Sequence, residues 1–263
     1  LSSSKNNTHD FCALSLSFDE NANIEQNTKE SKEFIFVVDC SGSMSYNPIK
    51  NAAECLEIFI KSLPTNSFFN IIRFGSSYEK LFDYSVQYNE DTAEKALRYV
   101  QNMDADLGGT ELYNPISDIF KNKAKYGKRE VFILTDGQVS DMEKIINLVA
   151  QNSNQNRCNT IGFGSGCDGV LVEGIANASG GKCDFVQYND SISEKVIPQL
   201  QSSLLPYIEN VEIHLQGDDN NSFEISPFPL PNLSYNNSSL CYLRCKKDTK
   251  DKQIQNPFSK GIL

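Results

Sequence analysis

The sequence predicts an α/β fold, in which a doubly wound, mostly parallel sheet carries helices on both faces and a partial β-rich segment follows at the C-terminus. Two observations support this prediction. Between residues 33 and 204, apolar runs of strand length alternate with segments whose apolar residues recur at helical spacing. The run Phe34–Val38 is apolar throughout, which is typical of a central parallel strand buried on both faces.

The individual elements follow from spacing and from helix-breaking residues. A helix is expected from Pro48, because Ile49 and Ile60 belong to an apolar pattern of helical spacing that Pro64 ends. Residues 81–86 are expected to form an antiparallel strand, since only a short connection separates them from the preceding strand. The remaining expected elements are strands at 68–74, 131–134, 159–163 and 184–187, and helices at 112–121, 142–150, 170–178, 193–204 and after an N-cap at Thr92.

Three regions differ in composition. Residues 1–32 are polar and are interpreted as a linker or the tail of a preceding domain, with one alternating run at Phe11–Phe18 that predicts a strand. Residues 33–204 form the predicted α/β domain. Residues 205–263 are expected to be a partial β-sandwich-like segment, because Val211, Ile213 and Leu215 alternate with polar residues and Leu240–Leu243 suits another strand.

Charge and hydropathy limit the classes of partner. The formal net charge is −10 at pH 7, which argues against nucleic acid and anionic lipid because both are polyanions. No apolar run approaches the roughly 18 residues of a membrane helix. We therefore expect no nucleic-acid partner and no membrane insertion. The basic stretch Lys121–Arg129 is interpreted as a solvated helix end and loop, with a weak site for an acidic partner as the alternative.

The cysteines bear on the compartment. The chain has eight, irregularly spaced and in several cases inside apolar runs, where cysteine behaves as a small apolar residue. A chain of this length also needs no disulfides to fold, so reduced thiols and a cytoplasmic setting are expected, with secretion as the alternative. Cys241 and Cys245 lack the second pair that a zinc site would need, and a structural role is expected for them.

The segment Asp39-Cys40-Ser41-Gly42-Ser43 follows the first buried strand directly. Ligands bind at the carboxyl ends of strands in α/β sheets. Asp39, Ser41 and Ser43 place one carboxylate and two hydroxyls on a tight turn, a donor set that suits a hard cation such as Mg²⁺. By itself the pattern is also explained by a turn in which Ser43 caps the next helix.

Two further loops add oxygen donors. Gly108-Gly109-Thr110 offers a hydroxyl from a glycine-bent loop, and Asp136 follows a second apolar strand, Val131–Leu134. If the two strands are neighbours, Asp39 and Asp136 reach the same crevice and Thr110 lies over it. The two carboxylates would balance the charge of Mg²⁺ and leave a coordination position open.

These segments resemble the von Willebrand factor type A domain family. Phe34–Ser43, Gly108–Thr110 and Thr135–Gly137 are similar, in order and spacing, to the three loops of its metal-ion-dependent adhesion site. The resemblance covers about residues 33–204. The sequence looks like the intracellular group in which a VIT domain accompanies the A domain, whose relatives include the inter-alpha-trypsin-inhibitor heavy chains and vault poly(ADP-ribose) polymerase. The sequence similarity extends to residues 62–64, 69–78, 105–112 and 176–181.

The resemblance implies a Rossmann-like fold and a metal site at Asp39, Ser41, Ser43, Thr110 and Asp136. It implies direct ligation by the two serines, partly water-mediated ligation by Asp39, and exchange between the two modes at Thr110 and Asp136. Mg²⁺ is the expected ion, with Mn²⁺ or Ca²⁺ as alternatives. A protein partner would complete the coordination with a Glu or Asp side chain. The implied function is metal-dependent protein binding.

Two other functions are weighed against this one. The domain is alternatively a structural subunit, a fixed packing block inside a larger complex. A Mg²⁺-dependent phosphoesterase is a less favoured alternative. Enzymes that form an aspartyl-phosphate need a second acid two residues after the nucleophile, and this chain has Ser41 at that position. The sequence also lacks a phosphate-binding GxxxxGK[ST] loop and a GxSxG nucleophile motif. We therefore expect a protein that is not an enzyme.

Two motifs have simpler explanations. Gly164–Gly169 matches the GxGxxG pattern of dinucleotide sites but comes late in the sheet, and a strand-to-helix turn is expected instead. His9 and His214 are the only histidines and are far apart, so a zinc hydrolase is not expected.

Overall fold

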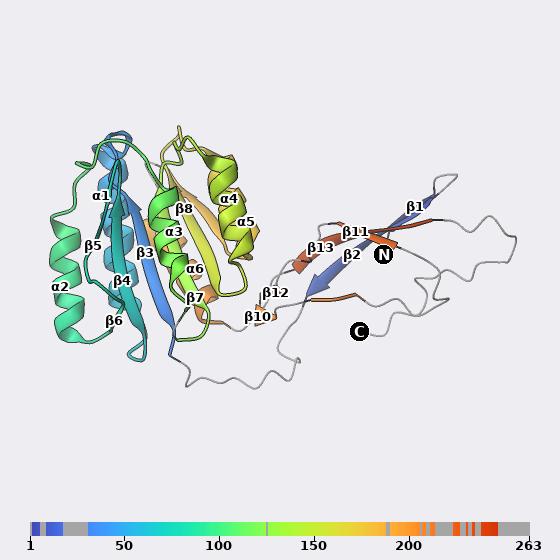
Figure 1. Ribbon diagram of the computed structural model, residues 1–263, viewed down its shortest axis with the longest axis horizontal. Coiled ribbons are helices and arrows are strands. Elements are labelled where there is room, and N and C mark those ends of the chain that lie inside the picture. Colours follow the sequence, from blue (N-terminus) through green and yellow to red (C-terminus); the bar gives the residue numbers. More distant parts are fainter. Residues whose placement is uncertain are drawn as a thin grey trace, which may run out of the picture. The chain divides into compact units, whose positions relative to one another are not determined.

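The chain divides into two compact units, an α/β unit of Glu25–Leu205 and a β unit of Leu1–Ile24 with Pro206–Leu263 (Figure 1). The computed structural model describes residues 2–5, 9–17, 31–124, 126–187, 190–205, 207–208, 211–213, 223–226, 230, 233–234 and 238–246.

The α/β unit alternates strands and helices as the sequence predicts. Its strands are β3 (Glu33–Asp39), β4 (Phe68–Phe74), β5 (Tyr78–Lys80), β6 (Val86–Gln87), β7 (Arg129–Thr135), β8 (Asn156–Phe163) and β9 (Cys183–Val186). Its helices are a short 3₁₀ turn (Gly42–Met44), α1 (Asn47–Ser62), α2 (Glu90–Gln101), α3 (Tyr113–Lys121), α4 (Met142–Gln151), α5 (Gly169–Ser179) and α6 (Ile192–Leu204).

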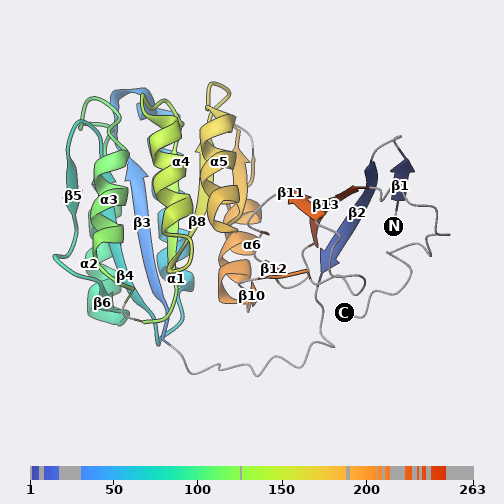
Figure 2. The ribbon, with the colours of Figure 1, turned by 45° about the vertical axis from the view of Figure 1, so that its right-hand side comes forward.

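The central strand β3 is buried along its whole length because helices cover both faces of the sheet. Its Phe34, Phe36 and Val38 belong to one apolar core with residues of α1, α2 and α6. Its Ile35 and Val37 point to the other core, which contains residues of α3, α4 and α5. Figure 2 shows α3, α4 and α5 on the near face of the sheet. The predicted doubly wound α/β fold is confirmed.

The strand order of this sheet is β5-β4-β3-β7-β8-β9, with β6 also paired to β4. All neighbours from β4 to β9 are parallel, and β5 and β6 run antiparallel to β4. The chain moves outward from β3 to β4 and then returns to continue at β7, on the other side of β3. The carboxyl ends of β3 and β7 therefore flank a topological switch point, where α/β folds bind ligands.

The strand expected at residues 81–86 is wrong in its extent. The edge forms two short strands, β5 and β6, with the intervening residues outside the ladder. The Asn70 side chain takes the place of the ladder there: its Nδ2 donates to the Phe82 carbonyl at 2.7 Å, and its Oδ1 accepts from the Phe82 amide at 3.1 Å. An amide side chain thus satisfies the edge backbone that a continuous strand would have paired.

The expected N-cap of α2 at Thr92 is also wrong. The helix begins after Asn89, whose side chain accepts a hydrogen bond from the Thr92 amide at 2.9 Å. The Thr92 hydroxyl accepts in turn from the Asn89 amide at 3.0 Å. Both residues are good caps by composition, and the reciprocal pair of bonds places the helix start three residues earlier.

The β unit contains an antiparallel sheet in the order β1-β2-β13-β11. Its strands are β1 (Ser2–Lys5), β2 (His9–Ser17), β13 (Ser238–Lys246) and β11 (Phe223–Ser226), and a separate pair is formed by β10 (Tyr207–Ile208) and β12 (Leu233–Ser234). The expected strands at 11–18 and 240–243 are thus present, and β2 pairs with β13 along nine residues. The domain types predicted for 1–32 and 205–263 stay predictions.

One face of this antiparallel sheet is buried and the other is exposed. Cys12, Cys241 and Cys245 are buried on one side, and burial raises the pKa of each thiol. Leu240 and Tyr242 are exposed on the other side. Residues 211–213 are not in a strand, contrary to expectation, and Leu215 and His214 lie outside the described residues.

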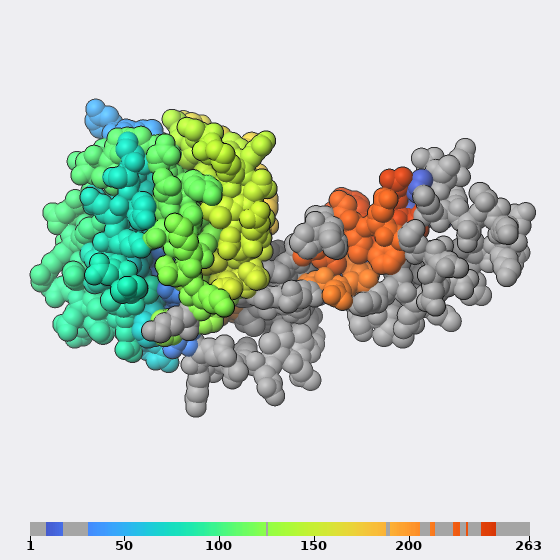
Figure 3. Space-filling model, viewed as in Figure 1, coloured from blue at the N-terminus to red at the C-terminus, as the bar shows by residue number. Residues whose placement is uncertain are grey.

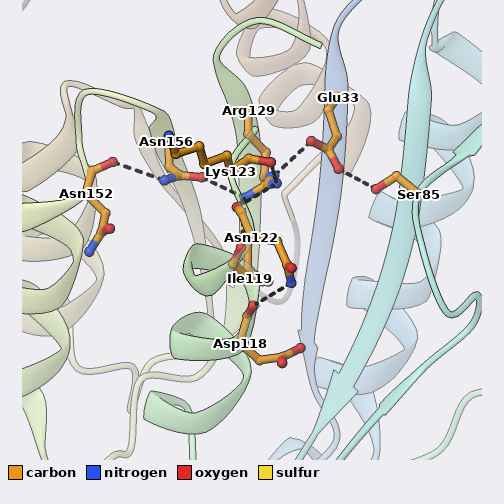
Figure 4. Close-up of polar contacts among 9 residues, drawn as sticks. All are labelled: Glu33, Ser85, Asp118, Ile119, Asn122, Lys123, Arg129, Asn152 and Asn156. Carbon is orange, nitrogen blue, oxygen red and sulfur yellow. Dashed lines mark hydrogen bonds and ion pairs between the residues drawn. The ribbon is translucent and has the colours of Figure 1, made fainter. Parts of the chain in front are cut away.

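Two buried ion pairs tie together the amino-terminal ends of the central strands. The Arg129 Nε donates to Glu33 Oε2 at 3.0 Å, and the Arg129 Nη1 donates to Asn156 Oδ1 at 3.1 Å and to the Ile119 carbonyl at 2.9 Å (Figure 4). Ser85 Oγ donates to the second oxygen of Glu33 at 2.6 Å. Arg129 is therefore a core residue, and its expected place in a solvated basic loop is wrong.

The second pair joins β7 to β8. Arg157 donates to Glu130 through Nε at 2.9 Å and through Nη2 at 2.7 Å, and Asn159 Nδ2 adds a bond to Glu130 at 3.0 Å. Glu130 and Arg157 lie directly opposite each other in the ladder and are almost fully buried. A buried charge left without its partner costs several kcal/mol, so this pair constrains the register strongly.

We expect Arg157→Met to lower the free energy of unfolding by about 3–5 kcal/mol, because it leaves the Glu130 carboxylate buried and unpaired. Denaturant unfolding at neutral pH measures the loss. The double variant Arg157→Met/Glu130→Met is the control and is expected to recover most of the stability. A single-variant loss below about 1 kcal/mol, the size of an exposed ion pair, would contradict this account.

Candidate metal centre

The sheet places the first and third candidate loops side by side. Strands β3 and β7 are parallel neighbours, with Val38 opposite Leu134. Asp39, the last residue of β3, and Asp136, the residue after β7, therefore emerge at the same edge of the sheet. The adjacency on which the predicted site depends is present.

The first loop folds back on Asp39. The Ser41 amide donates to Asp39 Oδ1 at 2.9 Å, and the hydroxyl oxygens of Ser41 and Ser43 are 3.0 Å apart. Ser41 is buried, whereas Ser43 is exposed. One carboxylate and two hydroxyls thus gather on five consecutive residues, and the outer hydroxyl faces solvent.

The second loop is bonded to the first. The Gly42 amide donates to the Gly108 carbonyl at 2.8 Å, and the Leu107 amide donates to the Cys40 carbonyl at 3.0 Å. These two backbone bonds hold the segment before Thr110 against the first loop. The half-buried Thr110 follows two residues after the bonded Gly108.

The turn after β4 supports the second loop from the other side. The Ser76 amide donates to the Leu107 carbonyl at 2.7 Å, and Ser76 Oγ accepts from the Gly109 amide at 2.7 Å. A Cβ atom at Gly75 would lie 2.3 Å from the Cβ of Leu107, so only glycine permits this approach. No role for Ser76 was expected from the sequence, and its position just after the end of a parallel strand was the available signal.

The third loop is bonded to Asp39 through Thr135. The Thr135 hydroxyl donates to Asp39 Oδ2 at 2.6 Å and accepts from the Gly137 amide at 2.9 Å. The Asp168 amide donates to the Asp136 carbonyl at 3.0 Å, which joins this loop to the start of α5. Gly137 has a φ of +78°, a conformation that a larger residue would strain. Thr135 orients the Asp39 carboxylate, and it was not among the site residues expected from the sequence.

The electrostatics of the two carboxylates favour a cation. Asp39 is fully buried and Asp136 is 5% exposed. Burial raises the pKa of Asp39, and the negative charge of Asp136 raises it further, against the hydrogen bonds from Ser41 and Thr135. None of the ion pairs found among the described residues includes either carboxylate. A divalent cation would offset two negative charges that are now compensated by dipoles alone.

The donor set fits a hard cation of this kind. It consists of two carboxylates and three hydroxyls, and Mg²⁺ prefers oxygen ligands together with several waters. In the described part of the chain, no group of three or more His, Cys, Asp and Glu side chains is arranged to hold a metal ion. A site here would therefore depend on the serine and threonine hydroxyls.

Cys40 lies inside the candidate loop but takes no part in its polar surface. It is fully buried in the core that contains α1, and burial raises the pKa of its thiol to about 12. A thiol with this pKa stays protonated at neutral pH and is a poor nucleophile and metal ligand. Cys40 acts as a small apolar residue.

The sequence profile of the von Willebrand factor type A domain matches residues 32–185. The chain belongs to the von Willebrand factor type A domain family. The match runs from β3 into β9 and includes the three candidate loops. The described helices of this A domain chain lack the length and apolar character of a membrane-spanning segment.

Curated relatives of the A domain extend the similarity. A von Willebrand factor A domain-containing protein of Dictyostelium discoideum is 39% identical over 226 residues, which are 86% of this chain and 24% of the relative. The human von Willebrand factor A domain-containing protein 5A is 39% identical over 208 residues, 75% of this chain and 26% of the relative. The chain thus spans about a quarter of the length of these relatives.

Solved structures share the fold at low sequence identity. A von Willebrand factor type A protein from Catenulispora acidiphila has a TM-score of 0.63 at 14% identity, over 92% of this chain and 61% of the other. Proximal thread matrix protein 1 from the mussel byssus, solved with zinc in its metal-ion-dependent adhesion site, has a TM-score of 0.53 at 17% identity, over 73% and 48% of the two chains.

The glycine-rich segment Gly164–Gly169 is the turn between β8 and α5, where Asp168 caps the helix by accepting from the Val170 and Leu171 amides. It does not open the first strand–helix–strand unit of the A domain. His9 lies in β2 with its Nε2 3.1 Å from an Arg244 nitrogen. The placement of Gly164–Gly169 agrees with a strand-to-helix turn, and the explanation of the histidines stays a prediction because His214 lies outside the described residues.

In the absence of metal, the A domain is expected to lose stability as the pH rises through the raised pKa of Asp39. The folded state binds the Asp39 proton more tightly than the unfolded state, so this contribution is complete below about pH 3.9, the ordinary aspartate pKa, and disappears above the raised value. Asp136→Asn removes the neighbouring charge and should therefore raise the Tm in EDTA at pH 7 by about 2–4 °C.

Differential scanning fluorimetry in EDTA between pH 4 and pH 8 measures this effect. Asp83→Asn, which neutralises an exposed carboxylate outside the site, is the control and should leave the Tm nearly unchanged. A lower Tm for Asp136→Asn than for the unmodified chain at pH 7 would show that repulsion between the Asp39 and Asp136 carboxylates does not destabilise the fold.

Proposed function

We propose that the A domain binds one Mg²⁺ at Asp39, Ser41, Ser43, Thr110 and Asp136 and uses it to bind a protein partner through a Glu or Asp side chain. The observation that carries this proposal is the pair of buried carboxylates at the switch point of the sheet, where hydrogen bonds but no basic side chain of the described residues compensate Asp39. When bound, the ion supplies a coordination position for the partner's carboxylate. Mn²⁺ and Ca²⁺ are alternative ions.

The chain's own residues have separate tasks in this proposal. Thr135 and the Ser41 amide hold the two oxygens of Asp39, so the carboxylate is oriented before any ion arrives. The Ser41 and Ser43 hydroxyls are direct ligands. Thr110 and Asp136 adjust between direct and water-mediated ligation when a partner binds. Preorganised ligands bind more tightly because less side-chain entropy is lost on binding.

The surface around the site indicates the charge of the partner. Asp104, Asp106 and Glu111 are exposed near the second loop, and the whole chain has a net charge of −10. A single charge-assisted contact contributes only a few kcal/mol, so flanking contacts must supply much of the affinity. We propose that the partner carries basic residues around its acidic side chain, which would also make binding sensitive to salt.

The wider setting is part of the same proposal. We place the chain in the group in which a VIT domain accompanies the A domain, in the cytoplasm, and as a protein that is not an enzyme. The eight cysteines are all free thiols, which suits a reducing compartment. A permanently occupied subunit of a larger complex is the second candidate, and secretion is the alternative location.

Thermal melts test the metal site. Mg²⁺ at about 100 times its Kd should stabilise the unmodified chain by roughly 2.7 kcal/mol, because it binds the folded state alone. The double variant Ser41→Ala/Ser43→Ala should lose this gain. Ser77→Ala, a serine of the β4–β5 turn outside the site, is the control and should keep it. Equal melting temperatures in Mg²⁺ and EDTA for the unmodified chain would exclude the site.

Peptide binding tests the partner. Immobilised peptides with one central Glu should bind the chain in Mg²⁺ at least about tenfold more tightly than matched peptides with Gln, since the charged contact is worth about 1.5–3 kcal/mol. EDTA and Asp39→Ala should abolish the preference, whereas the control Asp83→Ala should not. Binding of the Glu peptides that is unchanged in excess EDTA would refute metal-dependent recognition.

A further inference from the structure

Tyr46 has a backbone conformation that costs stability. Its φ is +71° and its ψ is −112°, and it is the one non-glycine residue with positive φ in the described part of the chain. Glycine adopts this conformation readily, but in other residues the Cβ atom clashes with the backbone. For a bulky side chain it is a strained state, and such strain is found disproportionately at functional sites.

The side chain of Tyr46 contributes little to the stability of the fold. It is 85% exposed, so it buries almost no apolar surface. Tyr46 is also the N-cap residue of α1, where Ser, Asn or Asp would accept a hydrogen bond from the helix, and its side chain makes no capping bond. Local stability would favour glycine at this position for its backbone and Ser, Asn or Asp for a capping bond.

The strained residue lies beside the candidate metal loop. Tyr46 follows Ser43 by three residues, in the segment that connects β3 to α1. Figure 3 shows the blue β3–α1 segment projecting beyond the neighbouring loops at the upper end of the α/β unit. The strained backbone therefore presents an aromatic ring to solvent at the edge that carries the two buried carboxylates.

Two other exposed apolar side chains lie in the first turns of helices that follow the second and third loops, Tyr113 in α3 and Val170 in α5. Tyr113 is 36% exposed and follows Thr110 by three residues. Val170 is 68% exposed and lies two residues after Asp168, whose amide is bonded to the Asp136 carbonyl. Each of the three candidate loops thus has an exposed aromatic or aliphatic side chain close to it in the chain or through one backbone bond. We name Tyr46, Tyr113 and Val170 the apolar rim.

We propose that Tyr46 determines specificity by contacting a large apolar side chain that stands next to the metal-binding carboxylate of the partner. The partner is then a polypeptide segment in which a Glu or Asp has an aromatic or aliphatic neighbour. This inference rests on the proposed metal-dependent function and adds the identity of the flanking residue. An aromatic ring suits such a contact, because it offers a large rigid apolar surface at low entropic cost.

The test uses the full chain and two immobilised peptides. Both have one central Glu in a Gly/Ser background, and the neighbouring residue is Phe in one and Ala in the other. The unmodified chain should bind the Phe peptide about fivefold more tightly in Mg²⁺, the gain expected of one aromatic contact. Tyr46→Gly should bind both peptides equally, and Tyr46→Phe should keep the preference.

Two further measurements separate recognition from folding. Tyr46→Gly should raise the Tm in EDTA by about 2–4 °C, because it relieves the backbone strain. Its Mg²⁺-induced rise in Tm should equal that of the unmodified chain, since no metal ligand is changed. The matched control is Tyr84→Ala: this tyrosine is 82% exposed, has ordinary φ, and precedes β6, which pairs with the amino-terminal end of β4. It should leave peptide preference unchanged.

A preference for the Phe peptide that survives in Tyr46→Gly, or a Tyr84→Ala variant that loses it, would overturn the inference. So would a fall in the Tm of Tyr46→Gly, which would assign the tyrosine a structural role. Equal Mg²⁺-dependent binding of both peptides to the unmodified chain would refute the apolar contact alone. Binding of neither peptide with Mg²⁺ dependence would refute the proposed function and this inference together.

Discussion

The burial of the Asp39 carboxylate beside Asp136 is the constraint on which the rest of the site depends. A buried carboxylate without a basic partner is costly, and here the bonds from Ser41 and Thr135 offset only part of that cost. The arrangement is stable in the fold because three loops bond to one another around it. The hydroxyl bonds among these loops reach Asp39, whereas the bond to the Asp136 carboxylate comes from the Gln138 amide, so a cation would offset the two charges most directly.

Ion pairs at the opposite end of the sheet fix the strand register that places Asp39 and Asp136 next to each other. Glu33 pairs with Arg129 between β3 and β7, and Glu130 pairs with Arg157 between β7 and β8. A slip of one residue in either ladder would separate a buried ion pair, which is far more costly than a change in apolar contacts. Because parallel strands rise together, a register fixed at their amino-terminal ends also fixes which residues meet at their carboxyl ends. The ion pairs therefore contribute to the site from a distance.

The sequence predicted the order of elements and the meeting of the loops because both follow from short-range signals. Fully apolar runs identified the buried strands, and acidic or hydroxyl residues after them identified the loops. It did not predict what depends on side chains reaching across the fold. Asn70 replacing part of the edge ladder, Arg129 entering the core and Thr135 bonding Asp39 all involve partners 12 to 96 residues away, and no local pattern encodes such contacts.

Several departures from ordinary folding preference lie in one short segment. Asp39 is buried with its pKa raised, Ser41 and Ser43 place hydroxyls beside it, and Tyr46 has a positive φ. Elsewhere in the α/β unit, Glu33 and Glu130 are paired with buried arginines, and side chains cap the starts of α2 and α5. Sequences that specify a fold agree with local preference almost everywhere, and the exceptions occur where function opposes stability. A buried carboxylate, two neighbouring hydroxyls and a strained tyrosine thus lie within eight consecutive residues, and this clustering is an argument, independent of any family resemblance, that the segment Asp39–Tyr46 is shaped by binding.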